Sequence, residues 1–344
     1  MKNDVGEIGE LALIEMLKRG LPRRADVRVG AGDDCAVVDC RRLQSTAIEC
    51  NRRQSNAVDG NRVQSNAVEL VLKSDPVIEG RHFRKDEAMG RVGRKAVGRV
   101  LSDFAAMGAA PRWGLVNLVL RPDIAVREVA ALYRGMQELG GRYGFAIVGG
   151  DTSQGKEFAV HVFGVGTLPR GSARLRSMAK AEDAVYVTGT LGGSLASGKH
   201  LDFEPRVKEG IFLRRWANAM IDVSDGLASE LWHIARASGV GIEVRSEELL
   251  HVCKGALPSP LRAALCDGED FELLFTVPRR KVAAFERVWR RTFPELSCTC
   301  IGRVRTGKAQ VVLDGKVLKV KGYEHFIKRD PPGAIAPPLR RRGI

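Results

Sequence analysis

The sequence predicts a mixed α/β protein built of two domains. The chain has 344 residues, which is enough for two cores. Short apolar runs typical of strands alternate with amphipathic segments typical of helices, and acidic residues beside glycine or serine recur near the ends of those runs. We expect one α/β domain at 1–168, a second at 169–330, and an irregular basic tail at 331–344.

Strands and helices alternate through the first half of the chain. Apolar residues at helical spacing predict a helix at 7–17, and a strand at 27–38 is interrupted by a Gly-rich turn at 30–34. Pro122 marks the start of a helix that ends at Gly140 and Gly141. The other elements expected here are strand 69–73, helix 86–107, strand 113–120, strand 145–148 and strand 158–168.

A polar segment that repeats every ten residues separates the first strands. Gln44, Gln54 and Gln64 each begin a copy of the pattern Gln-Ser-Thr/Asn-Ala-Ile/Val. Three short polar copies bury too little apolar surface for a solenoid. We therefore expect 41–68 to be an inserted surface loop.

The second half continues the mixed pattern. Asp314 and Gly315 lie between two short apolar runs, which is typical of a type I′ turn and predicts a hairpin at 311–318. The other elements expected here are strand 184–188, helix 225–237, strand 271–277 and helix 279–291.

Composition narrows the classes of function. No run approaches the roughly 20 apolar residues that span a bilayer, and residues 1–19 lack a signal-peptide layout, so no membrane partner is expected. Seven cysteines lack the paired spacing of zinc sites, which indicates reduced thiols in a cytoplasmic protein. The net charge of +14 would attract the phosphate backbone of a nucleic acid. Apart from the runs at 279–281 and 340–342, however, the basic residues are dispersed along the chain, so specific nucleic-acid binding is not expected.

Five acidic motifs beside small residues indicate the kind of reaction. Most of them, taken alone, are typical of a turn or a helix cap. Asp103 instead lies on a helix patterned for burial, where an unpaired carboxylate is costly. Together they indicate an enzyme that uses a nucleotide and several Mg²⁺ ions, because Mg²⁺ is usually held by a few carboxylates and by substrate phosphates. The motifs lie at 30–34, 73–75, 101–103, 149–151 and 222–226.

In this order the motifs resemble the thiamine-monophosphate kinase family, within the superfamily that includes aminoimidazole ribonucleotide synthetase and selenophosphate synthetase. The stretches 79–83 and 321–326 resemble the kinase more than its relatives. The resemblance implies a two-domain aminoimidazole ribonucleotide synthetase-like fold with α/β (α+β) N-terminal and C-terminal domains. The matching stretches cover nearly the whole chain apart from the insert and the tail: 29–36, 74–83, 101–108, 149–152, 187–190, 219–226, 267–273 and 321–326.

The resemblance also implies an activity, which is the phosphorylation of thiamine phosphate to thiamine diphosphate with ATP as co-substrate and several Mg²⁺ ions. It implies a homodimer, because the active site of this family lies at a dimer interface. Metal roles are implied for Asp34, Ser74, Asp75, Asp103, Asp151, Asp222 and Asp225. Contacts to ATP are implied for Gly150, Asp151, Arg176 and Ser224. Substrate contacts are implied for His82, Glu269 and Tyr323.

The implied reaction needs no catalytic side chain that acts as a strong base. The acceptor phosphate oxygen is already ionised, and phosphoryl transfer depends mainly on positioning and charge neutralisation. The chain departs from the family pattern at Lys73, where Ser or Thr is usual, and at Val100, where Asn is usual. The stretch 195–203 is also shorter than expected.

Two other functions stay open at this point. A selenophosphate synthetase-like enzyme is expected to carry a reactive cysteine or selenocysteine in an N-terminal Gly-rich loop, whereas Cys35 falls inside the match at 29–36. A non-catalytic nucleotide-binding or basic scaffold protein is disfavoured because Asp75, Asp103 and Asp151 are retained.

Overall fold

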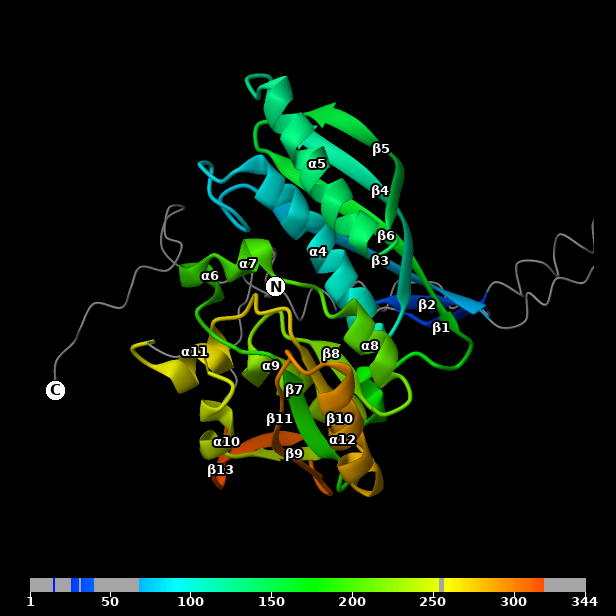
Figure 1. Cartoon of the computed structure of the whole chain (residues 1–344), viewed down its shortest axis with the longest axis vertical. Helices are drawn as coiled ribbons and strands as arrows, with labels where there is room; N and C mark the ends of the chain where they lie inside the picture. The colour runs from blue at the N-terminus through cyan, green and yellow to red at the C-terminus, as the bar shows by residue number, and fades with distance from the viewer. Residues whose placement is uncertain (1–14, 16–25, 31, 40–67, 254–256, 319–344) are drawn as a thin grey trace, which may run out of the picture.

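The computed structural model describes residues 15, 26–30, 32–39, 68–253 and 257–318. The predicted helix at 7–17 lies outside these residues except for Glu15. The predicted insert at 41–68 lies outside them except for Val68. The predicted tail at 331–344 lies outside them entirely. Figure 1 shows two sheets, one in each half of the molecule, with α4 at the junction between them. The mixed α/β architecture expected from the sequence is confirmed.

The first sheet has six strands in the order β1-β2-β3-β6-β4-β5. Its pairs are antiparallel except for the parallel pair β4 and β5. The helices α4 (Met89–Met107) and α5 (Val126–Arg142) cover one face of this sheet (Figure 1). Its strands are β1 (Val27–Val29), β2 (Ala36–Val38), β3 (Val68–Ile78), β4 (Ala110–Leu120), β5 (Ala146–Gln154) and β6 (Ala159–Pro169).

Three strands, β3, β4 and β5, are longer than predicted, and the extensions of β3 and β5 change the setting of two acidic motifs. The strand expected to end at Lys73 continues through Asp75, because the backbone stays paired with β6 as far as Ile78. The strand expected at 145–148 likewise runs on through Asp151, paired with β4. The expectation that both motifs follow a strand is therefore wrong. Ladder pairing outweighs the low strand propensity of Gly, Asp and Ser at these positions.

The second sheet has seven strands in the order β13-β12-β9-β11-β7-β10-β8. The predicted strand at 184–188 is confirmed as β7, and the strand at 271–277 begins two residues later than predicted. The strands are β7 (Ala184–Thr188), β8 (Met220–Asp222), β9 (Gly241–Val244), β10 (Leu273–Val277), β11 (Cys298–Arg305), β12 (Gln310–Leu313) and β13 (Lys316–Val317).

Helices surround the second sheet. The helix predicted at 279–291 begins as the 3₁₀ turn η3 (Arg279–Lys281) and continues as α12 (Val282–Thr292). The predicted hairpin is confirmed, with Asp314 and Gly315 both at positive φ as a type I′ turn requires. The remaining helical segments are η2 (Arg176–Met178), α6 (Ser194–Ser197), α7 (Lys199–Asp202), α8 (Val207–Leu213), α9 (Leu227–Ser238), α10 (Ser246–Leu250) and α11 (Pro260–Cys266).

Apolar packing joins the two halves. One buried cluster extends from α4 and the first sheet to Tyr186, Phe275 and Phe285 on the α12 side of the second sheet. A second cluster fills the α9 side of the same sheet. Helix α4 contacts β3, β6 and α5 as well as α8 and β8, so it is the element shared by both halves. Within the described part of the chain, no helix combines the length and apolar character needed to cross a bilayer.

The contact between α4 and α5 depends on glycines. A Cβ added at Gly93 would lie 2.0 Å from the carbonyl oxygen of Leu132, and one added at Gly135 would lie 1.9 Å from the carbonyl oxygen of Gly90. Both clashes are with backbone atoms, which cannot rotate away. These glycines therefore let the two helix backbones approach closely, and they fix how deeply α4 packs.

We expect Gly135→Ala to lower the free energy of unfolding by about 1–3 kcal/mol, as overpacking between rigid elements does. The matched control is Gly141→Ala, because Gly141 lies in the same helix with nothing within 4 Å of an added Cβ. That change should leave stability unchanged or raise it by up to about 1 kcal/mol. Urea denaturation measures both, and equal effects of the two substitutions would contradict the packing argument.

Candidate active site

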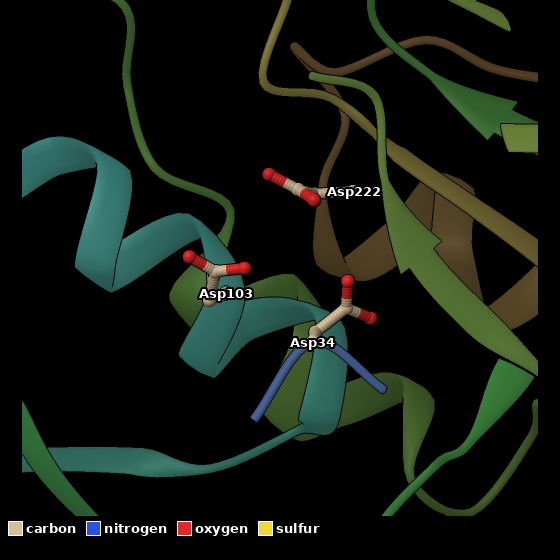
Figure 2. A group of neighbouring side chains, drawn as sticks. All are labelled: Asp34, Asp103 and Asp222. Carbon is tan, nitrogen blue, oxygen red and sulfur yellow. The ribbon is translucent and has the colours of Figure 1, made fainter. Parts of the chain in front are cut away.

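Three buried carboxylates converge at the junction of the two halves. Asp34 lies in the turn between β1 and β2, Asp103 lies near the end of α4, and Asp222 is the last residue of β8. One oxygen from each lies within 4.8 Å of the others, and Figure 2 shows the side chains pointing toward one another. The structure thus brings together three of the predicted metal ligands from three separate stretches of chain.

The protonation of this group reflects burial and crowding. Burial, and then the neighbouring charge of Asp34, raise the pKa of Asp222 to about 6. Burial raises the pKa of Asp103 well above its usual range, even though Lys73 opposes the shift. The pKa of Asp33, next to the group, rises to about 7 through burial and through the charge of Asp34. A bound cation would relieve this repulsion and favour the ionised carboxylates.

The hydrogen bonds of the group fit a divalent cation. The hydroxyl of Ser102 donates to Oδ2 of Asp222 at 2.6 Å, and the guanidinium of Arg176 pairs with Oδ1 of Asp34. Oδ2 of Asp34 is fully buried and has no hydrogen-bond partner among the residues that the structure describes. Because a buried carboxylate oxygen without a partner is costly, this atom is suited to a hard cation such as Mg²⁺.

Asp75 has a different environment from those three carboxylates. The ammonium Nζ of Lys73 lies 3.0 Å from Oδ2 of Asp103 and 3.6 Å from Oδ2 of Asp75. A guanidinium nitrogen of Arg99 lies 3.6 Å from Oδ1 of Asp75. The carboxylate of Asp75 is therefore flanked by cations of the chain itself, which holds its pKa below the usual range although burial works in the opposite direction.

Two loops that carry predicted ligand residues lie against each other. The backbone N–H of Glu269 donates to the carbonyl oxygen of Ser224 at 2.6 Å. Gly268 adopts a φ of +71°, and a Cβ added there would lie 2.7 Å from that same oxygen, so only glycine suits this contact. Buried Glu230 accepts from the backbone N–H of Asp225 at 3.0 Å and holds this loop at the start of α9.

Lys95 joins two of the predicted substrate residues. Its ammonium is fully buried and donates to the backbone carbonyl of His82 at 2.6 Å and to both carboxylate oxygens of Glu269 at 2.9 Å. The imidazole Nδ1 of His82 accepts from the backbone N–H of Ile78 at 3.0 Å, which places the ring proton on Nε2. The third predicted substrate residue, Tyr323, lies outside the described residues.

Ser74 and Asp151 lie apart from the group of three carboxylates. Side chains of a strand alternate between faces, so Ser74 lies on the face opposite to its neighbours Lys73 and Asp75. Asp151 is exposed on β5, and its carboxylate accepts from the backbone N–H of Thr152 at 2.8 Å. Gly150, beside it, has a φ of +152°, and a Cβ there would lie 1.9 Å from the carbonyl oxygen of Val116.

The sequence reasoning missed two cations of the site, Lys95 and Arg99, although it named Arg176 and Lys73. Lys95, Arg99 and Asp103 follow one another at intervals of four residues, which places them on one face of α4. Charged residues at this spacing, beside the apolar positions of a buried helix, are the signal that could have identified Lys95 and Arg99. Glu230 was also missed, and its position in the first turn of α9 resembles ordinary helix capping.

Comparison with known proteins shows which family this chain resembles. The family model described as "AIR synthase related protein, N-terminal domain" matches residues 32–168. A thiamine-monophosphate kinase from Aquifex aeolicus is 32% identical, and the match covers 93% of this chain and 99% of the relative. A thiamine-monophosphate kinase from Salmonella typhimurium is 33% identical, with 92% of this chain and 98% of the relative covered.

A solved structure is similar to this chain in fold as well as in sequence. AaThiL complexed with AMPPCP and TMP superimposes with a TM-score of 0.75 at 31% identity, covering 94% of this chain and 99% of that one. The likeness therefore extends over both sheets and over the junction where the carboxylates meet. The chain belongs to the thiamine-monophosphate kinase family.

Proposed function

We propose that this chain transfers the γ-phosphoryl group of ATP to thiamine monophosphate and so forms thiamine diphosphate. The observation that carries the proposal is the convergence of Asp34, Asp103 and Asp222 beside the Ser224–Glu269 contact, in a chain that matches a thiamine-monophosphate kinase over 93% of its length. A relative solved with AMPPCP and TMP supports the choice of the two substrates. ATP as co-substrate, with the reduced cysteines inferred above, favours the cytoplasm.

We assign Mg²⁺ to the group formed by Asp34, Asp103 and Asp222, with Asp225 as a neighbouring ligand. When bound, Mg²⁺ would neutralise phosphate charge. The orphaned Oδ2 of Asp34 and the raised pKa of Asp222 support this assignment. Arg176 positions Asp34 through their ion pair and lies close enough to the group to meet an incoming phosphate.

The remaining residues hold and orient the substrates. Lys95 holds both the loop of His82 and the carboxylate of Glu269 in place. In this proposal that carboxylate accepts a hydrogen bond from the thiamine part of thiamine monophosphate. Glu269 itself adopts a φ of +53°, a conformation that costs energy in a non-glycine residue and persists because Lys95 and Ser224 hold it. Ser224 is assigned to ATP, and Tyr323 to the substrate.

We also propose that two copies pair through the open face of the first sheet. Trp113, Leu115, Val148 and Phe163 are all exposed there, and Leu115 lies opposite Phe163 across the β4–β6 ladder. Several large apolar side chains exposed on one face are typical of an interface between chains. Pairing through this face would also bring Ser74, Gly150 and Asp151 to the interface, which accounts for their distance from the other carboxylates and keeps their predicted metal and ATP roles.

The substrate assignment is tested by incubating the protein with ATP and Mg²⁺ and with either thiamine monophosphate or thiamine as acceptor. We expect thiamine diphosphate from the first and no product from the second. The reason is that a phosphate acceptor is already ionised, whereas a hydroxyl acceptor needs a general base. Chromatography resolves the products, and formation of thiamine monophosphate from thiamine alone would refute the assignment.

We expect Asp103→Asn to fold normally and to lower kcat by at least about 100-fold at saturating Mg²⁺, since metal neutralisation of phosphate charge supplies several kcal/mol. The matched control is Asp314→Asn, in the exposed hairpin turn where asparagine tolerates positive φ. That variant should keep wild-type turnover. Steady-state kinetics with a circular dichroism check measures both, and near-normal turnover of Asp103→Asn would exclude a metal role.

The dimer is tested by light scattering. The wild-type protein should have twice the chain mass of 37.5 kDa, and Leu115→Arg should have the mass of one chain, because it places a charge in an apolar interface. Leu250→Arg, on exposed α10, is the control and should stay dimeric. A monomeric wild-type protein would contradict this part of the proposal.

A further inference from the structure

Lys73 occupies a position suited to a cation between two carboxylates. It precedes Asp75 by two residues on β3, so both lie on the face that α4 covers. Its ammonium is 3.0 Å from Oδ2 of Asp103 and 3.6 Å from Oδ2 of Asp75. Asp103 is thus shared, because its carboxylate also belongs to the group with Asp34 and Asp222.

A lysine ammonium carries a positive charge at neutral pH. That of Lys73 lies within ion-pair distance of both carboxylates. The side chain keeps 23% of its surface exposed, so the ion pair is only partly shielded from solvent. The ammonium therefore places a charge of the chain itself between Asp75 and Asp103.

Arg99 strengthens the same arrangement from the other side. Its guanidinium lies 3.6 Å from Oδ1 of Asp75 and 3.7 Å from Oε1 of Glu269. Asp75 is consequently placed between two cations of the chain, and a divalent ion bound there would meet both at short range. Like charges so close repel strongly in a partly buried site. The residues around Asp75 do not fit a divalent ion, in contrast to the orphaned oxygen of Asp34.

We propose that Lys73 is a resident cation that takes the place of one divalent ion between Asp75 and Asp103. Metal then binds only on the side of Asp103 that faces Asp34 and Asp222, and Asp75 serves Lys73 and Arg99 rather than a metal. This inference rests on the proposed function, because it concerns the metal ions that accompany the nucleotide. It assigns to Lys73 a positioning role that fixes how many metal ions the site holds.

The test counts bound metal ions without turnover. The probe is Mn²⁺, titrated in the presence of the nonhydrolysable analogue AMPPCP, with free Mn²⁺ followed by electron paramagnetic resonance. Two neutral variants, Lys73→Met and Lys73→Gln, are compared with the wild-type protein. We expect each neutral variant to bind one more equivalent of Mn²⁺ per chain than the wild type. Removal of the ammonium leaves Asp103 without this cation and leaves Oδ2 of Asp75 facing it, while Arg99 stays beside Oδ1 of Asp75.

Two controls separate this effect from a general loss of charge. Lys73→Arg keeps the cation and should retain the wild-type count. Lys281→Met removes a half-buried lysine whose ammonium donates to the carbonyl of Arg215 at 2.8 Å, on η3 of the second half, and should also retain that count. In the neutral variants Mn²⁺ should raise the thermal midpoint by more than in the wild type, since the metal replaces the missing charge.

An unchanged Mn²⁺ count in both neutral variants would overturn the inference, and so would a loss of folding that Mn²⁺ does not restore. Neither readout uses thiamine monophosphate or product formation. The inference can therefore fail while the proposed reaction stands, and a protein that forms no thiamine diphosphate can still give a decisive Mn²⁺ count.

Discussion

The arrangement of this molecule depends on neutralising carboxylates that meet inside it. Asp34, Asp75, Asp103 and Asp222 come from four different stretches of chain and are all buried. Four such charges in one place would oppose folding unless each is paired or bound to a cation. Arg176, Lys73 and Arg99 provide part of the compensation, and the buried Oδ2 of Asp34 has no hydrogen-bond partner among the described residues. The two halves of the fold therefore meet at the place where these buried carboxylates have to be neutralised.

Helix α4 sets the geometry of that meeting point. Its glycines allow α5 to approach closely on one side, and its face with Lys95, Arg99 and Asp103 lies toward the loops of the other half. The depth at which α4 packs fixes where Asp103 lies relative to Asp222. A close-packed glycine contact far from any ligand therefore contributes to the site, because interiors transmit small displacements of rigid elements.

Much of the fold was predictable because apolar periodicity is local. The strand at 184–188 and the hairpin at Asp314 and Gly315 follow from neighbouring residues alone. The extensions of β3 and β5 did not, since Ser74 and Asp151 are held in strands by ladders with β6 and β4 that are distant in sequence. Five acidic motifs were visible in the sequence, but which of them meet depends on the packing of the two sheets around α4.

The extension of β3 also explains why the motif at 73–75 places side chains on both faces of the first sheet. In a strand the side chains of Lys73 and Asp75 point to the helix-covered face, and that of Ser74 points to the open face. Read as a turn, these three residues would form a single ligand cluster. In the strand, Lys73 and Asp75 instead form a charge pair beside Asp103. Ser74 lies on the opposite face, which carries Leu115 and Phe163. In the dimer that we propose, charge balance inside one chain and contact with a second chain would be coupled through these three consecutive residues.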